Sequence, residues 1–165
     1  MAVDTFGTLD VALNNAGIGG EASKVGKMSE DAWLQVININ LNGVFNCMRH
    51  ELAHMWKQKS GIIVNMSSVM GKVGFSTSSH YVAAKHGVIG LTQTAALEYA
   101  TDGIRINAIC PGFIDTPLLT KIGINSREGA KQRIIDLHPM KRLGKPEEIA
   151  KGFIFLACDQ SSFIS

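Results

Sequence analysis

The stretch GIIVNMSS, residues 61–68, decides the fold of this chain. Its three consecutive large aliphatic residues predict a strand at 62–64 that is buried on both faces, and the serines predict the loop that follows. A long helix is expected over 81–100, and Gly103 provides a suitable end for it. A fully apolar strand followed by a long helix is typical of a βαβ unit in a parallel sheet.

The same alternation of strands and helices extends from this stretch toward both ends of the chain. Apolar runs closed by Asn, Gly or Pro predict the strands, and apolar residues at helical spacing predict the helices. The predicted fold class is therefore α/β, with a parallel sheet and flanking helices. In chain order, the further elements are a strand at 10–13, a helix beginning at Ser29, a strand at 104–110, a helix at 126–137 and a helix from Pro146 to about residue 157.

Composition limits the classes of protein to which the chain can belong. Its 165 residues, 45% hydrophobic and 18% charged, are enough for a single domain spanning 1–165 and exclude a disordered chain. No apolar run approaches the roughly 18 residues of a membrane helix. A net charge of +2 is too small to indicate binding of nucleic acid. We therefore expect neither a membrane nor a nucleic acid as partner.

The cysteines indicate a reducing compartment. Cys47, Cys110 and Cys158 are widely spaced, form no CxxC pair and have apolar neighbours. We expect buried, free thiols rather than a disulfide or a metal site. The N-terminus lacks the basic and apolar regions of a signal peptide. A cytoplasmic location is the resulting expectation.

Tyr81 and Lys85 form the first candidate for chemistry. Their i, i+4 spacing places a phenol and an ammonium on one face of the predicted helix. A nearby cation favours the phenolate, so the pKa of Tyr81 is expected below its ordinary value of about 10. The pair alone occurs often by chance. Ser67 and Ser68 strengthen it, because they end a buried strand at the edge where open α/β sheets bind ligands.

Five motifs in register give the chain a family resemblance. It resembles the short-chain dehydrogenases/reductases from its first strand to its last helix. The resemblance implies a partial, Rossmann-like, doubly wound parallel sheet that contains strands four to six of the family order. The motifs are NNAG at 14–17, NLNG at 40–43, NMSS at 65–68, YVAAK at 81–85 and RINAICPG at 105–112.

The resemblance also implies a reaction and the residues that perform it. The reaction is hydride transfer between NAD or NADP and a small-molecule alcohol or carbonyl substrate. Tyr81 would be the acid/base, and Lys85 would bond the nicotinamide ribose and lower the pKa of Tyr81. Ser68 would orient the substrate oxygen, with Ser67 as its structural neighbour. Asn40 matches the helix residue that holds a water in a proton relay behind Lys85.

Two further groups of residues match parts of the family that contact the cofactor. The small residues near residue 16 let the backbone approach a ligand closely, although the same motif also stabilises the sheet in this family. Residues 118–139 correspond to the variable substrate lid, and none of them identifies a substrate. Neither does any residue choose between NAD and NADP. The cofactor-contact residues are Asn14, Ala16 and Gly17 in the first group and Pro111, Gly112, Ile114 and Thr116 in the second.

A competing motif indicates a zinc hydrolase. His50-Glu51-Leu52-Ala53-His54 satisfies HExxH on a predicted helix, the pattern of two metal-binding imidazoles and a Glu base. Lys57 and Ser60 stand where the extended form of the motif needs Gly and His. The two histidines also lie opposite the apolar stripe of their helix. A metal-free protein is therefore the preferred expectation, and the hydrolase is a remote alternative.

The resemblance implies segments that this sequence does not contain. Family members begin with a strand and a Gly-rich turn that hold the pyrophosphate, and they end with a further strand. We therefore expect a fragment of a longer reductase that binds the cofactor weakly or not at all and whose own activity is doubtful. The strand at 10–13 should form an apolar sheet edge.

A non-catalytic role is the alternative to an enzyme. The long helices expected at 29–57 and 81–100 match those of the family's dimer contact, so a homodimer or homotetramer through them is implied. A remnant acting as an oligomerisation or binding module would use the same surfaces. The presence of Asn40, Ser68, Tyr81 and Lys85 together favours an enzymatic origin.

Overall fold

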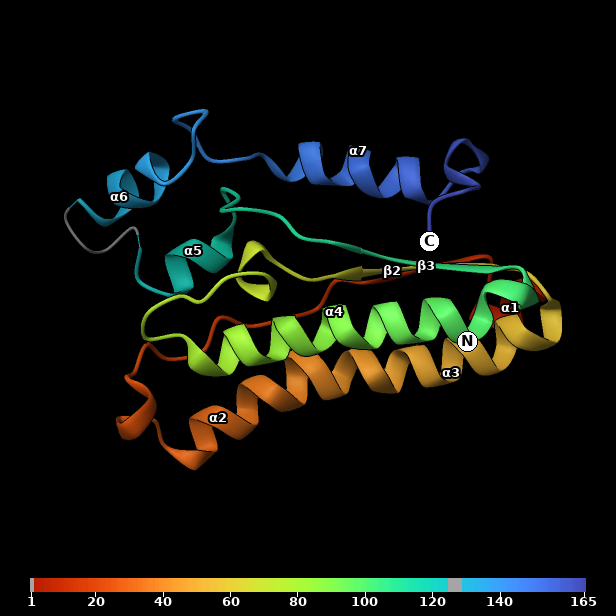
Figure 1. Cartoon of the computed structure of the whole chain (residues 1–165), viewed down its shortest axis with the longest axis horizontal. Coiled ribbons are helices and arrows are strands. Elements are labelled where there is room, and N and C mark those ends of the chain that lie inside the picture. The colour runs from red at the N-terminus through yellow and green to blue at the C-terminus, as the bar shows by residue number, and fades with distance from the viewer. Residues whose placement is uncertain (1, 125–128) are drawn as a thin grey trace.

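The centre of the molecule is a parallel three-stranded sheet with the order β1-β2-β3 (Figure 1). A computed structural model describes residues 2–124 and 129–165. Its strands are β1 (Val11–Asn14), β2 (Gly61–Met66) and β3 (Ile104–Ile109). Ile62 pairs with Val11 on one side and with Arg105 on the other. Because the pairing is parallel, the carboxyl ends of all three strands lie on the same side of the sheet. The three predicted strands and the α/β class are confirmed.

Helices cover both faces of this sheet, as a doubly wound fold requires. α2, α3 and α4 lie on one face, and α7 lies on the other (Figure 1). The core lies mainly under α3 and α4, where Met48, Met55 and Val88 pack against Ile63, Ile104 and Ile106. In chain order the helices are α1 (Ala2–Phe6), α2 (Glu30–Ile37), α3 (Gly43–Gln58), α4 (Ser79–Tyr99), α5 (Pro117–Lys121), α6 (Ala130–Asp136) and α7 (Pro146–Leu156).

Several predicted helix boundaries change in the structure. The single helix expected from Ser29 is divided, because a wider π-helical turn at Asn38–Asn42 separates α2 from α3. The proposed start of a helix at Ser126 lies outside the described residues, and α6 begins at Ala130. α5 was not expected; it begins one residue before the segment assigned to a substrate lid and forms the start of that segment.

Local chemistry accounts for the ends of the long helices. The Ser29 side chain accepts a hydrogen bond from the Ala32 backbone N–H (3.2 Å), which confirms the predicted start of α2. After α4, the chain turns at Gly103 with φ of 75°. A Cβ on Gly103 would lie 2.6 Å from the Lys59 carbonyl oxygen, so only glycine fits where the two helix ends meet.

The two outer strands of the sheet, β1 and β3, differ in how far other parts of the chain cover them. At one edge, Val11 and Leu13 of β1 are 37% and 41% exposed, which agrees with the expected apolar edge. At the other edge, the Arg105 guanidinium donates hydrogen bonds to the carbonyl oxygens of Leu156, Cys158 and Ile164. These bonds hold the end of α7 and the turn after it against β3.

Two expectations about surface character can be compared with the structure. None of the helices in the described ranges combines the length and apolar character needed to cross a bilayer. The expectation of buried cysteines was wrong for Cys47, which is exposed on α3, while Cys110 and Cys158 are half-buried. Cys47 has apolar neighbours in sequence, but Phe45 beside it is itself 47% exposed because both lie on the outward side of the helix.

Candidate active site

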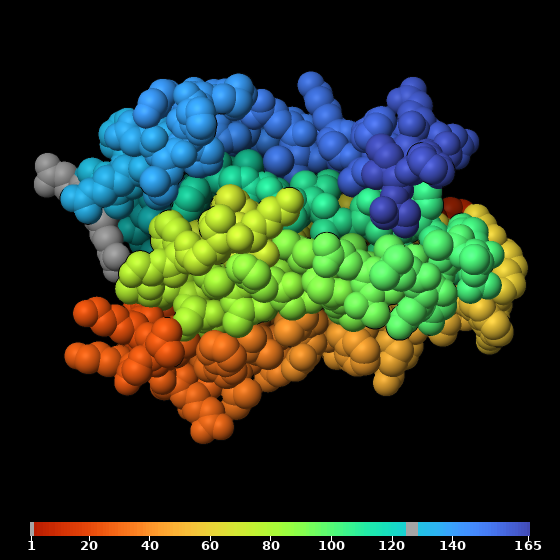
Figure 2. All heavy atoms as spheres, viewed as in Figure 1, coloured from red at the N-terminus to blue at the C-terminus, as the bar shows by residue number. Residues whose placement is uncertain are grey.

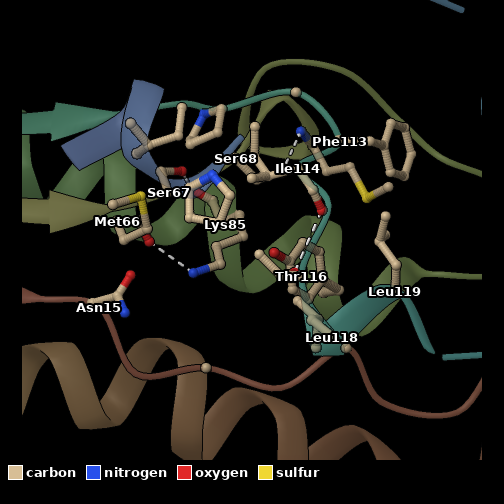
Figure 3. Close-up of a pocket in the computed structure, with 18 of the residues that line it drawn as sticks. Asn15, Met66, Ser67, Ser68, Lys85, Phe113, Ile114, Thr116, Leu118 and Leu119 are labelled. Carbon is tan, nitrogen blue, oxygen red and sulfur yellow. Dashed lines mark hydrogen bonds between the residues drawn. The ribbon is translucent and has the colours of Figure 1, made fainter. Parts of the chain in front are cut away.

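The candidate site lies where β2 and β3 end. Ser67 and Ser68 follow β2, and Pro111 follows β3 after one residue. Backbone hydrogen bonds from Ser67 N–H to the Ile109 oxygen and from Val69 N–H to the Pro111 oxygen, both 2.8 Å, join the two loops. A cavity of about 600 Å³ opens at this edge, within the range typical of small-molecule sites (Figure 3).

Most of the residues expected at the site line this one cavity. They come from the loop after β1, the two loops just described, the first turns of α4 and the segment that begins α5. Asn14, Ala16 and Asn40 are not among the lining residues. Those that line it are Gly17, Ser68, Tyr81, Lys85, Pro111, Gly112, Ile114 and Thr116.

Lys85 is a buried cation at the floor of the cavity. Its side chain is 3% exposed, and its Nζ donates a hydrogen bond of 2.7 Å to the Met66 carbonyl oxygen (Figure 3). Burial lowers the pKa of Lys85 to about 8, and the nearby Cys110 thiol acts in the opposite direction. The same Nζ lies 5.6 Å from the centroid of the Tyr81 ring. The ammonium is therefore close to the phenol and fixed by the end of β2.

The pKa of Tyr81 differs in direction from the sequence-based expectation. Burial raises it above the ordinary value, and a side-chain hydrogen bond with Ser68 lowers it in part. The sequence argument considered only the attraction between the phenolate and Lys85. In the folded chain, loss of solvent around the phenol is the larger effect, while the Lys85 ammonium donates to a backbone carbonyl. The phenol of this structure is therefore protonated at neutral pH.

The two serines after β2 have different partners. Ser67 Oγ donates a hydrogen bond of 2.9 Å to the Lys85 carbonyl oxygen and so ties β2 to α4. Ser68 Oγ accepts a hydrogen bond from the Met70 backbone N–H (3.1 Å), and the Ser68 side chain lowers the pKa of the Tyr81 phenol in part. Ser67 thus holds the helix in place, whereas Ser68 is the serine that affects the pKa of Tyr81.

Asn40 acts on the cavity through the loop that follows β1. It is fully buried in the π-helical turn, and its Nδ2 donates to the Ile18 oxygen (2.7 Å) while its Oδ1 accepts from the Ile18 N–H (2.8 Å). A Cβ added to Gly17 would lie 3.2 Å from Asn40 Oδ1 and 3.7 Å from Lys85 Nζ. The missing side chain at Gly17 therefore lets the loop backbone come close to both groups.

Asn14 belongs to a buried network under the sheet. Its Nδ2 donates hydrogen bonds to Asn65 Oδ1 (2.9 Å) and to Glu51 Oε2 (3.0 Å). Asn65 in turn donates to Thr92 Oγ1 (2.9 Å), which links β1, β2, α3 and α4. The position of Asn14 fits its expected role in stabilising the sheet, and the cofactor contact expected of Asn14 and Ala16 stays a prediction.

The HExxH residues do not come together around a possible metal position. His50 is exposed and His54 half-buried, while the Glu51 carboxylate accepts the hydrogen bond from Asn14. Burial raises the pKa of Glu51, and the Asn14 contact lowers it in part. Within 2–124 and 129–165, no three His, Cys, Asp or Glu residues are grouped so that they could hold a metal ion.

The sequence analysis did not find the apolar wall of the cavity. The rings of Phe75 and Phe113 pack edge to face with their centroids 5.8 Å apart, and Met70 and Leu118 line the same cavity. Phe113 directly follows Pro111-Gly112, so its place beside the cavity could have been inferred from that motif. Phe75 lies in a loop that carries no periodic signal. Among the described lining residues, Lys85 alone carries a charge.

Comparisons with known proteins show which family the chain resembles over its whole length. The family model described as enoyl-(acyl carrier protein) reductase matches residues 1–165. The chain is 47% identical over 164 residues to cyclohexanol dehydrogenase of Acinetobacter sp. (strain SE19), covering 99% of this chain and 62% of that protein. It is also 47% identical over 163 residues to 3-oxoacyl-[acyl-carrier-protein] reductase FabG of Thermotoga maritima, covering 99% and 64%. The chain thus spans less than two thirds of the length of these relatives.

Solved structures give the same result. The crystal structure of levodione reductase superposes with a TM-score of 0.94 at 40% identity, covering 99% of this chain and 65% of that chain. ElxO with NADP bound gives 0.92 at 44% identity, covering 99% and 65%. NAD+-bound xylitol dehydrogenase gives 0.91 at 34% identity, covering 99% and 68%. These relatives contain NADP in one case and NAD+ in another.

Proposed function

Because the chain belongs to the short-chain dehydrogenase/reductase family, we propose that it catalyses hydride transfer between NAD or NADP and an alcohol or carbonyl substrate. The observation that carries the proposal is the meeting of Ser68, Tyr81 and Lys85 in one cavity at the carboxyl edge of the sheet. Open α/β sheets bind ligands at this edge. A spacing found by chance on a surface helix would not bring these three side chains together.

The residues around the cavity fit a nicotinamide cofactor. Lys85 has an ammonium with three donors, of which one bonds the Met66 oxygen, so it can also bond ribose hydroxyl groups. Gly17 lines the cavity, and its lack of a side chain lets the loop backbone lie close to Lys85. Pro111, Gly112, Ile114 and Thr116 would line the side of the nicotinamide. When bound, the nicotinamide ring accepts or donates the hydride.

Tyr81 would move the proton of the substrate oxygen. In carbonyl reduction, its protonated phenol donates to that oxygen, and the raised pKa keeps the phenol protonated at neutral pH. In alcohol oxidation, the phenolate must accept the hydroxyl proton, so oxidation should accelerate with rising pH. Ser68 would hold the substrate oxygen beside the phenol. Lys85 would place a positive charge near the phenolate as it forms.

The walls of the cavity favour a substrate with an apolar body. Phe75, Phe113, Met70 and Leu118 offer no charge or hydrogen bond to a ligand. A carboxylate or phosphate placed against them would lose water without gaining a partner, which is unfavourable. We therefore propose an uncharged alcohol or ketone rather than a charged metabolite.

We also propose that the protein is a homodimer or homotetramer that uses α3 and α4. These helices lie side by side along one long face of the molecule (Figure 2). Phe45 and Trp56 of α3 and Leu97 of α4 are 47%, 50% and 85% exposed, and burial of these apolar side chains against a second copy of the chain would be favourable. The free thiols favour a reducing compartment, and we propose the cytoplasm.

Transfer of deuterium tests the proposed reaction. Because the chain spans less than two thirds of the length of its relatives and is expected to bind the cofactor weakly, it is incubated with millimolar NAD+ or NADP+ and with cyclohexanol deuterated at the carbinol carbon. The C–D bond breaks, the deuteride passes to the nicotinamide ring and the hydroxyl proton leaves through Tyr81. Deuterium in the reduced cofactor, found by mass spectrometry, is the expected result. A folded chain that binds the cofactor by calorimetry but transfers no deuterium from any of several secondary alcohols would favour a non-catalytic binding module.

A further inference from the structure

The residue directly before Tyr81 makes two buried contacts that the proposed reaction does not use. His80 is the second residue of α4 and is 0% exposed. Its Nδ1 accepts a hydrogen bond of 2.8 Å from the Tyr81 backbone N–H, and its Nε2 lies 3.1 Å from the Glu21 carbonyl oxygen. One ring nitrogen is thus an acceptor and the other a donor, as in a neutral imidazole with its proton on Nε2.

The Nδ1 contact satisfies a donor that the helix itself cannot. The first backbone N–H groups of an α-helix have no partner within the helix. Ser78, at the N-cap position of α4, makes no side-chain capping bond. His80 Nδ1 therefore provides the acceptor for the Tyr81 N–H. In this way the imidazole fixes the backbone of the residue that carries the phenol.

The Nε2 contact fixes the loop after β1. The loop backbone at Gly20 has φ of +73°, and a Cβ added there would lie 2.5 Å from His80 Nε2. The imidazole and the loop are therefore in close contact. Three residues before Glu21, the backbone of Ile18 is held by Asn40. The loop that places Gly17 in the cavity is thus attached to the π-helical turn at one point and to α4 at another.

We propose that His80 is a positioning residue that joins the loop after β1 to the turn of α4 that carries Tyr81. We call the contacts of His80 with Tyr81 and Glu21 the His80 bridge. The bridge keeps the phenol and the loop beside the cofactor in one fixed arrangement. Its effect on catalysis rests on the proposed function, but the two contacts themselves do not.

Three substitutions separate the two halves of the bridge. His80→Asn keeps an acceptor near the position of Nδ1 but is too short to reach Glu21. His80→Gln can keep a donor near the position of Nε2 and lose the acceptor for Tyr81. His80→Leu keeps much of the bulk and removes both bonds. His86→Gln on the same helix is the matched control, because His86 is exposed and its ring nitrogen lies 2.9 Å from the Val82 oxygen of its own helix.

Two measurements report on Tyr81 without any turnover. Hydrogen exchange by NMR follows the Tyr81 amide, and ultraviolet titration follows its phenol in a Tyr99→Phe background, where Tyr81 is the remaining tyrosine. We expect exchange at least about tenfold faster in His80→Gln and His80→Leu but near the parent rate in His80→Asn. The titration midpoint in His80→Leu should fall toward the ordinary value, as the phenol gains solvent. His86→Gln should match the parent in both.

The opposite results would overturn the inference. Exchange and titration at parent values in a folded His80→Leu would show that His80 only fills space. Should His80→Leu fail to fold by circular dichroism, equal amide exchange in His80→Asn and His80→Gln would overturn it instead. Where turnover is measurable, His80→Gln should lower kcat more than it changes KM. Because exchange and titration need no cofactor, a failure of the proposed reaction remains distinguishable from a failure of the bridge.

Discussion

α3 and α4 each carry a pair of functional-looking side chains one helical turn apart, and the two pairs have different surroundings. His50 and His54 on α3 have the spacing of metal ligands, but one is exposed and the other half-buried. Tyr81 and Lys85 on α4 have the same spacing and line a cavity of about 600 Å³. The difference is one of place, because α4 begins beside the loops that leave β2 and β3.

Glu51, which lies between the two histidines of α3, shows the same difference between the helices. A metal-dependent hydrolase would need Glu51 as a base. In this structure Glu51 is half-buried, and its carboxylate instead accepts a hydrogen bond from Asn14. In the second pair, Lys85 bonds the Met66 oxygen at the end of a strand and still faces the cavity. Spacing along a helix therefore does not identify a functional pair by itself. The pair that lines the cavity is the one whose helix begins beside the end of a buried strand.

The largest effect is expected at Lys85. Lys85→Met keeps the length of the side chain but removes the ammonium beside the phenol and the donors available to a ribose. Turnover should fall roughly 10³-fold, the scale of losses in acid–base catalysis. Initial rates at saturating cofactor measure it, and Lys57→Met on the exposed side of α3 is the matched control. Wild-type turnover in Lys85→Met would remove Lys85 from the mechanism.

The same substitution should change how stability depends on pH. The pKa of Lys85 is about 8 in the folded chain and 10.5 ordinarily, so burial of the ammonium destabilises the fold below pH 8. As pH rises from 8 to 10.5 this cost disappears, and wild type gains stability relative to Lys85→Met by at most about 3 kcal/mol. Urea unfolding of both chains across this range measures the gain. Parallel curves would contradict the lowered pKa.

A smaller effect of pH is expected at Glu51. Its pKa is raised in the folded chain, so the carboxylate is disfavoured by folding. Stability should therefore decrease as pH rises through the unfolded and then the folded pKa, and Glu51→Gln should lack this decrease. Above that range the variant should equal or exceed wild type by up to about 1 kcal/mol, since Gln can still accept from Asn14. Chemical unfolding at acid and neutral pH provides the measurement, and a loss of turnover in Glu51→Gln would revive a role as base.

The smallest effect is expected at the two histidines of α3. His50→Ala and His54→Ala remove one exposed and one half-buried imidazole, so stability should change by less than about 1 kcal/mol and turnover should remain close to wild type. Elemental analysis of the purified chain should find far less than one zinc per chain. Stoichiometric zinc that either substitution releases would instead support the hydrolase.

Apolar patterning and turn residues predicted the secondary structure well but could not give its interruptions. The strands were placed within two residues because short aliphatic runs end at Asn, Ser or Pro. The division between α2 and α3 was not predicted, because the apolar stripe continues across the π-helical turn. That turn presents Asn40 to Ile18, a contact between residues far apart in sequence.

The sequence predicted several residues that line the cavity, but it did not predict their pKa shifts or hydrogen-bond partners. The motifs named Ser68, Tyr81 and Lys85, which line the cavity. The predicted direction of the shift in the pKa of Tyr81 was wrong. Burial raises this pKa, and burial depends on elements that pack around the phenol only in the folded chain. The motif gave Asn14 both a cofactor contact and a role in stabilising the sheet, but it could not give the hydrogen-bond partners, which are Asn65 and Glu51. Local motifs contain no information about such long-range contacts.

The phenol of Tyr81 offers the most direct test of which helix performs the chemistry. Deuterium transfer at saturating cofactor is compared between wild type, Tyr81→Phe and His54→Ala, with cofactor binding followed by calorimetry. We predict that Tyr81→Phe retains cofactor affinity within about threefold while its transfer rate falls by at least about 100-fold, and that His54→Ala transfers like wild type. Transfer by Tyr81→Phe at the wild-type rate, or its loss in His54→Ala alone, would contradict the assignment of catalysis to α4.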